Sequence, residues 1–200
     1  RSNCVTGVQT CALPIYDDWD LTDRWAISLQ GKYYTEPMDV VVDMPELDGI
    51  PLKLISSGAF YNNAMVTSLT VKNPIERIAY RAFCNASNLK NVTFYNKGEG
   101  IDFIDTLAFS DCRSLESIDL SNSSITEIPE NAFSNCTSLK TGKLPSTVTK
   151  IADDAFADCK KLEEIQGLSN CKISEIGKDA FAGCYNLKTF DISSATITSL

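Results

Sequence analysis

The cysteines are the side chains of this chain best suited to chemistry, and there are eight of them. No C-x-x-C spacing occurs, so a thiol redox pair or a zinc knuckle lacks its usual arrangement. The chain also contains no histidine, which removes the usual general base for a nucleophile and the commonest metal ligand. The sequence therefore predicts no catalytic residue, no metal site and no cofactor.

Four of these cysteines occupy the same place in a repeated pattern. The pair Ala-Phe recurs six times, at intervals of 23, 26, 24, 23 and 25 residues, and in four repeats a cysteine follows three residues after the phenylalanine. A near-constant period of this size predicts a solenoid, in which each coil packs its apolar face against its neighbours. The pairs are Ala59-Phe60, Ala82-Phe83, Ala108-Phe109, Ala132-Phe133, Ala155-Phe156 and Ala180-Phe181.

The apolar spacing around each pair predicts a short helix, since steps of 4, 1, 3 and 3 residues place side chains on one helical face. In one repeat these residues are Ile128, Ala132, Phe133, Cys136 and Leu139. Pro129 suits the first turn of such a helix, where a missing N–H costs nothing. A polar column two residues after each phenylalanine suits left-handed backbone that ends the helix. This column consists of Asn62, Asn85, Asp111, Asn135, Asp158 and Gly183.

An alternating stretch such as Leu115-x-x-Ile118-x-Leu120 follows in each repeat and predicts a short, half-buried strand. Stacked once per coil, these strands would form a parallel sheet with a spacing of about 4.8 Å. Gly142 indicates a weak strand or a bulge in its repeat. Outward-facing residues of the strands form the candidate binding face, for which a simply solvated surface is the alternative. They are Asn91, Thr93, Ser117, Asp119, Thr141, Lys143, Glu164, Gln166, Thr189 and Asp191.

The combined pattern I-x-x-I-x-x-x-A-F-x-x-C-x-x-L-x-x-I-x-L resembles the BspA-like leucine-rich repeat over roughly residues 36–200. The resemblance implies an α/β solenoid: a right-handed leucine-rich repeat superhelix with short parallel strands on the concave face and short helices on the convex side. We expect six Ala-Phe units and a truncated seventh that opens at residues 197–200. Residues 16–35 are expected to form an N-terminal cap or hairpin, with a turn at residues 30–31.

The first fifteen residues form a separate segment. Residues 5–15, VTGVQTCALPI, resemble a translated sequencing adapter, so we interpret residues 1–15 as a non-native artefact. An unusual secretory leader is the alternative interpretation. We expect the natural protein to continue beyond both ends of the chain.

The charge of the chain is concentrated near its start. The net charge is −8, and residues 16–50 carry nine acidic and two basic side chains, against 17 and 15 in residues 51–200. Without a basic patch, nucleic acid is not an expected partner. No apolar run approaches the roughly 20 residues that a membrane-spanning helix needs, so no membrane span is expected in this fragment.

The cysteines allow three interpretations. On the predicted helical face they would pack as small buried hydrophobic groups. A ladder of disulfides between neighbouring coils is also compatible with coil spacing. Cys84 and Cys171 fall outside the repeated column and are the predicted reactive thiols.

The family resemblance implies a non-enzymatic binding module of a secreted or cell-surface adhesin, with an extracellular protein or glycan as its ligand. Two alternatives stay open: an intracellular or envelope interaction scaffold, and the targeting arm of a larger enzyme. The polar strand faces suit weak, multivalent contacts in each case.

Deletion of residues 1–15 should leave the midpoint of thermal unfolding unchanged, because an adapter-derived segment contributes no packing. Circular dichroism on the full and shortened chains measures the midpoint. A clear drop would show that the segment belongs to the folded protein.

Overall fold

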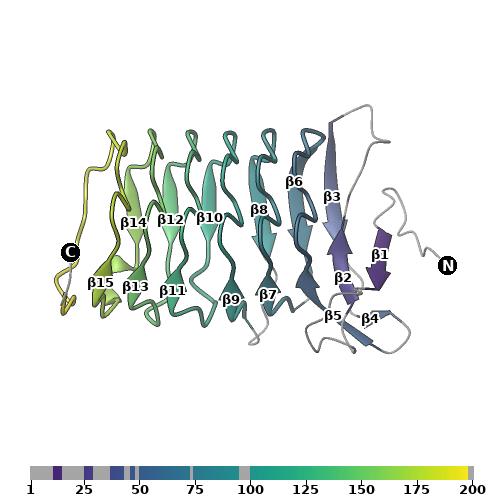
Figure 1. Ribbon diagram of the computed structural model, residues 1–200, viewed down its shortest axis with the longest axis horizontal. Helices are drawn as coiled ribbons and strands as arrows, with labels where there is room; N and C mark the ends of the chain where they lie inside the picture. The colour runs from purple at the N-terminus through teal and green to yellow at the C-terminus, as the bar shows by residue number, and fades with distance from the viewer. Residues whose placement is uncertain are drawn as a thin grey trace.

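The chain folds as a solenoid of parallel strands, whose coils lie side by side along one axis (Figure 1). The computed structural model describes residues 11–14, 25–28, 37–42, 46–47, 50–72, 74–94 and 100–197. In the coils between residues 77 and 166 the chain passes from a two-residue strand through the Ala-Phe turn into a longer strand and returns through a loop. The predicted parallel-strand solenoid is therefore confirmed.

The longer strands form one parallel sheet, here called the long-strand sheet. Its order from the C-terminal end is β14 (Glu164–Gln166), β12 (Thr141–Lys143), β10 (Ser117–Asp119), β8 (Asn91–Phe94), β6 (Val66–Val71) and β3 (Met38–Val42). A register shift between Met38 and Asp39 interrupts the pairing of β3 with β6. Gly142 pairs in regular register with Ile118 and Ile165, so the predicted bulge is absent from β12.

The two-residue strands form a second set that periodicity did not predict. β7 (Arg77–Ile78) and β9 (Phe103–Ile104) continue a sheet that contains β5 (Ile50–Ile55). A separate parallel sheet contains β11 (Glu127–Ile128), β13 (Lys150–Ile151) and β15 (Glu175–Ile176). Ile128 therefore lies on a strand, and its predicted place on a helix is wrong.

Pro129 explains why the short strands divide between β9 and β11. In the neighbouring coils the residue after the short strand donates its N–H to the isoleucine carbonyl of the preceding coil: Ala79 to Ile55, Asp105 to Ile78, Ala152 to Ile128 and Gly177 to Ile151, at 2.7–3.0 Å. Proline occupies this position in the remaining coil and has no N–H to donate. The predicted role of Pro129 as a helix start is wrong, and the residue instead interrupts a ladder of hydrogen bonds.

Three further strands lie near the N-terminus. β1 (Cys11–Pro14) pairs antiparallel with β2 (Trp25–Ser28), β2 runs parallel to β5, and β4 (Glu46–Leu47) pairs antiparallel with β5. The predicted second strand of the hairpin, residues 32–34, lies outside the described residues. The proposed division at residues 15 and 35 stays a prediction.

The Ala-Phe segments are turns, so the predicted convex helices are wrong. Alternate N–H groups bond within the segment to the residue three positions earlier, as Ala132 does to Pro129 at 3.1 Å. The intervening N–H groups bond to the next coil, as Phe133 does to Ala155 at 2.8 Å. An α-helix needs every N–H for the carbonyl four residues earlier, which this alternation prevents. Within the described ranges the one helix is a 3-10 turn at Leu168–Asn170.

Two columns of left-handed residues bound each turn. The predicted polar column has positive φ throughout, from 55° at Asn62 to 74° at Gly183. A second column, two residues before each phenylalanine, was not predicted and includes Leu107 at φ 61°. A left-handed leucine is rare, so the hydrogen bond from its N–H to Glu130 of the next coil, at 3.2 Å, must help to hold it. The other members are Gly58, Arg81, Asn131, Asp154 and Asp179.

The core is a stack of phenylalanine rings along the axis of the solenoid. Successive rings from Phe60 to Phe181 lie 4.7–5.4 Å apart, with interplanar angles of 7–11°. Phe190 closes the C-terminal end with an edge contact on Phe181 at 4.9 Å. Five of the rings are at most 1% exposed, and the predicted buried spine is confirmed.

Replacing Phe133 by alanine should lower the free energy of unfolding by about 3–5 kcal/mol, because it leaves a cavity between two stacked rings. Urea unfolding followed by circular dichroism measures the change. Tyr185 is 81% exposed, so Tyr185→Ala is the matched control and should cost under about 0.5 kcal/mol. A Phe133→Ala loss as small as the control's would contradict the spine as the main source of stability.

Candidate binding surface

The predicted binding residues lie in two rows across the long-strand sheet. Strand register aligns one row through Asn91, Ser117, Thr141, Glu164 and Thr189. The second row aligns Asp119, Lys143 and Gln166 on three neighbouring strands, and Thr93 pairs with Thr70 of β6. All nine predicted residues in these strands and the bridge are exposed or half-buried, whereas Val92, Ile118 and Ile165 between them are buried. The tenth, Asp191, lies beyond the last strand and accepts a hydrogen bond from the N–H of Ser193 at 2.9 Å.

Two charges on this sheet, those of Lys143 and Asp119, are paired with each other. Lys143 lies 3.2 Å from Asp119, and Asp119 also accepts hydrogen bonds from the N–H and hydroxyl of Ser121 at 3.0 and 2.6 Å. Partial burial acts to raise the pKa of Asp119, but the hydrogen bonds from Ser121 and the contact with Lys143 outweigh it and lower that pKa. Asp119 is thus held as a carboxylate whose charge is largely satisfied.

A line of alternating charge borders the strand starts. Lys140 pairs with Glu116 at 3.3 Å, and Lys188 pairs with Glu163 at 2.7 Å. The Lys188 contact lowers the pKa of Glu163. The two charges of each pair largely neutralise each other along this edge, whereas the row beside them carries the further carboxylate of Glu164, which accepts a hydrogen bond from the amide of Gln166.

The sequence analysis missed Asp39, which extends the first row at its N-terminal end. Asp39 pairs in register with Ser68 and accepts hydrogen bonds from the hydroxyls of Ser68 and Thr67 at 2.6 and 2.8 Å. These two bonds lower the pKa of Asp39. The stretch from Met38 to Val42 alternates in burial like the later strands, but its three consecutive valines hide that alternation in the sequence.

The column cysteines make a contact that the sequence did not predict. Each thiol donates to the phenylalanine carbonyl of the preceding coil at 3.1–3.2 Å, as Cys136 does to Phe109. Burial, together with the neighbouring Cys112, raises the pKa of Cys136. The six cysteines from Cys84 to Cys184 are all free thiols. Core packing is therefore confirmed for Cys112, Cys136 and Cys159, which are fully buried.

The surroundings of Cys84 and Cys171 do not favour the thiol reactivity predicted for them. Cys171 is fully buried and burial raises its pKa, so its prediction is wrong. Burial also raises the pKa of half-buried Cys84. By contrast, the neighbouring thiol of Cys159 lowers the pKa of half-buried Cys184. Since the thiolate is the nucleophile, we expect Cys184 to react more readily than Cys84.

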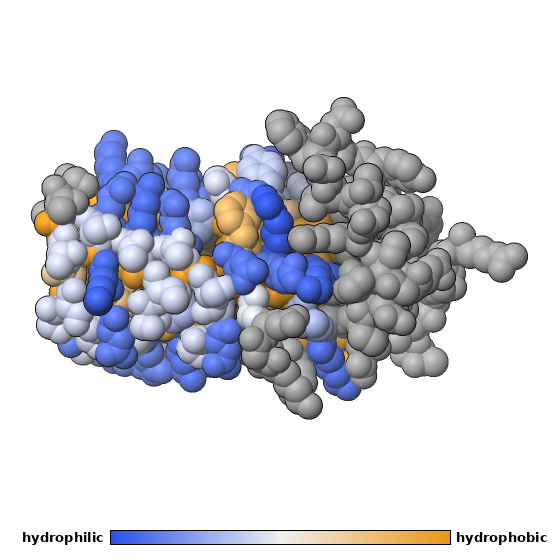
Figure 2. Space-filling view, turned by 90° about the horizontal axis from the view of Figure 1, so that it is seen from below, coloured by the Kyte–Doolittle hydropathy of each residue, from blue (hydrophilic) through white to orange (hydrophobic). Residues whose placement is uncertain are grey.

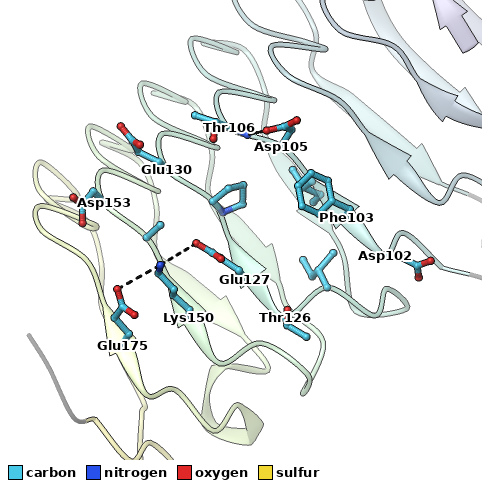
Figure 3. A pocket seen from close by; sticks show the side chains of 14 residues that line it. Asp102, Phe103, Asp105, Thr106, Thr126, Glu127, Glu130, Lys150, Asp153 and Glu175 are labelled. Carbon is cyan, nitrogen blue, oxygen red and sulfur yellow. Dashed lines mark hydrogen bonds and ion pairs between the residues drawn. The ribbon is translucent and has the colours of Figure 1, made fainter. Parts of the chain in front are cut away.

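A groove of about 480 Å³ lies over the short strands, and none of the residues in the predicted rows lines it (Figure 3). Buried Ile104, Ile125 and Ala152 line it, with Phe103 exposed at 44%. Six carboxylates surround it: Asp102, Asp105, Glu127, Glu130, Asp153 and Glu175. No pattern in the sequence signalled this groove, because its residues come from four coils and differ in type at equivalent positions of the repeat.

Lys150 is the one cation among the residues that line the groove, and it is already paired. Its ammonium lies 3.4 Å from Glu127 and 3.5 Å from Glu175, one coil to either side (Figure 3). The charge of Glu127, its hydrogen bond and the charge of Glu175 raise the pKa of Lys150. The groove is therefore strongly negative even with this lysine protonated.

Within the described ranges, no three or more histidine, cysteine or acidic side chains are arranged to hold a metal ion. Among those same residues, no helix has the length and apolar character needed to cross a bilayer.

The stacked parallel strands and the phenylalanine spine define a leucine-rich solenoid. The chain belongs to the BspA type leucine rich repeat family, whose model matches residues 53–188 and 143–200. None of the curated proteins compared with the sequence matches it.

Two solved structures share this fold. The leucine-rich repeat protein of T. pallidum is 23% identical with a TM-score of 0.60, over 83% of this chain and 84% of that one. A leucine rich cell surface protein from Faecalibacterium prausnitzii is 23% identical with a TM-score of 0.59, over 90% of this chain. This chain spans 52% of the length of the Faecalibacterium protein.

Iodoacetamide should alkylate Cys184 before Cys84 at mildly alkaline pH, because the lower thiol pKa gives more thiolate. Peptide mass spectrometry after timed quenching measures each cysteine separately. Buried Cys112, Cys136, Cys159 and Cys171 should react only when denaturant is added. Early labelling of Cys171 in the folded protein would contradict its buried placement.

Proposed function

We propose that this protein is a non-enzymatic binding module of a secreted or cell-surface adhesin, and that the long-strand sheet contacts an extracellular protein or glycan. The observation that carries the proposal is the in-register row through Asn91, Ser117, Thr141 and Glu164. It presents hydroxyl, amide and carboxylate groups at regular one-coil spacing across an open sheet. Such an array suits a ligand that itself repeats.

The chemistry of the row supports weak contacts multiplied over several coils. Tight protein interfaces depend on buried aromatic and arginine anchors, and the ten candidate residues include neither type. Small polar groups give individually weak hydrogen bonds, since each replaces a bond to water. Affinity would then come from several copies bound at once, which raises apparent affinity by about 10²–10⁴ without new contacts.

The proposed location rests on the family and on one relative. The chain belongs to the BspA type family, and the Faecalibacterium structure is of a cell surface protein. A surface protein that meets repeated ligands is the setting in which multivalent binding works best.

The test compares monomeric protein with protein tetramerised on streptavidin, each applied to a glycan array and to immobilised extracellular-matrix proteins. The tetramer should bind a subset of these probes at least about a hundredfold more tightly than the monomer. Ser117→Arg, which places a bulky charge in the centre of the row, should abolish that binding.

Ser146→Arg is the matched control, because Ser146 is exposed in a loop beyond β12. It introduces the same side chain outside the row and should leave binding unchanged. Equal loss in both variants, or no binding by the tetramer to any probe, would contradict the proposal.

A further inference from the structure

We propose that the acidic groove over β9, β11, β13 and β15 is a second binding site, which takes an extended, arginine-bearing peptide segment of a partner protein. It lies apart from the candidate rows of the long-strand sheet, so the two proposals can fail independently. Three features of the groove carry the inference: its shape, its unpaired negative charge and its aromatic edge.

The shape comes from an interruption of the repeat. Pro129 lines the groove at the point where β9 and β11 do not pair. Elsewhere along the short strands of β5–β9 and β11–β15, each strand pairs with the next coil. The interruption leaves apolar Ile104, Ile125 and Ala152 lining a hollow of about 480 Å³, which is within the size range of ligand pockets.

The charge of the groove is compensated only in part. Asp105 lies 3.6 Å from Arg77, and Lys150 neutralises part of the charge of Glu127 and Glu175. The other three carboxylates accept hydrogen bonds from neutral groups: Asp102 from the hydroxyl of Ser124, Glu130 from the amide of Asn131 at 3.3 Å, and Asp153 from the N–H of Lys178 at 2.8 Å.

Among the described residues, Asp102, Glu130 and Asp153 form no ion pair. Glu130 and Asp153 stand on adjacent coils, since the N–H of Asn131 bonds to the carbonyl of Asp153. The phenylalanine rings of the same two coils are 5.2 Å apart. Alternate side chains of an extended peptide are about 6.6 Å apart, so neighbouring basic side chains of such a peptide can reach both carboxylates.

Phe103 favours arginine in the peptide. The guanidinium of Arg77 lies over its ring, 4.2 Å from the ring centroid, and 44% of the surface of Phe103 remains exposed. An aromatic ring attracts a cation at its face, and a guanidinium also stacks there. Apolar lining, fixed carboxylates and an exposed ring together match a basic extended segment better than a small metal ion, for which no ligand cluster exists among the described residues.

Fluorescence anisotropy of labelled Arg-Gly-Arg-Gly-Arg-Gly with the full chain tests the proposal. The peptide should bind saturably at low ionic strength and more weakly at high ionic strength, because surface charges are screened by salt. Glu130→Gln combined with Asp153→Asn should weaken binding by about tenfold. Phe103→Leu should weaken it by severalfold while keeping an apolar side chain.

Glu164→Gln combined with Asp191→Asn is the matched control, since it removes the same charge from the other candidate surface. Its affinity for the peptide should stay within twofold of the unaltered chain. If the two double variants weakened binding equally, the peptide would be held by non-specific charge attraction, and the proposed site would be overturned. Absence of saturable binding to the unaltered chain, or an unaltered affinity in Glu130→Gln/Asp153→Asn, would also overturn it.

Discussion

The hydrogen bonds that each Ala-Phe turn makes to the next coil are the interaction on which the rest of this structure depends. Phe83, Phe109, Phe133 and Phe156 each donate an N–H to the alanine carbonyl of the following coil, at 2.7–2.8 Å. This fixes adjacent turns at one backbone spacing, and the rings then stack at about the same spacing. Only a small residue fits beside each ring at this distance, and the alanines are at most 3% exposed.

The same interaction explains the cysteine column. Each phenylalanine carbonyl accepts one N–H inside its own turn, as Phe109 does from Cys112. Its second acceptor position would be buried and unpaired without the thiol of the following coil, as Cys136 supplies for Phe109 at 3.1 Å. Cysteine suits this position because its side chain is small and its S–H group is a weak hydrogen-bond donor. The thiols are therefore structural, although their spacing first suggested chemistry.

The sequence predicted what depends on side-chain periodicity. The spine, the parallel strands from β6 to β14 and the polar left-handed column all follow from apolar or turn-forming residues at fixed positions. The predicted convex helices are wrong, because apolar residues spaced three and four apart are compatible with the repeated turns of a solenoid as well as with a helix. A turn and a helix differ in which carbonyl each backbone N–H bonds to. In these turns alternate N–H groups bond to a neighbouring coil, which side-chain spacing does not reveal.

Other features lay beyond periodicity for different physical reasons. A two-residue strand such as β13 is too short for alternation to be visible, so Lys150 could not be aligned with Glu127 and Glu175. Arg81 and Leu107 adopt left-handed backbone that their residue types disfavour, and only their position in the repeat could have indicated it. The candidate face was predictable because its residues alternate with buried ones, whereas the groove was not.

The long-strand sheet repeats without interruption, whereas the short strands are interrupted between β9 and β11, so the two surfaces differ in kind. A repeated surface such as the long-strand sheet offers the same weak contact several times, and its edge pairs neutralise one another along the axis. The short strands lose their continuity at one proline, where an exposed ring lies close to apolar lining and to three carboxylates that form no ion pair with any described residue. The proposed arginine-bearing partner would therefore bind at this interruption and not on the repeated surface. Seen from below, the described surface carries mostly hydrophilic and intermediate side chains, with smaller hydrophobic areas between them (Figure 2).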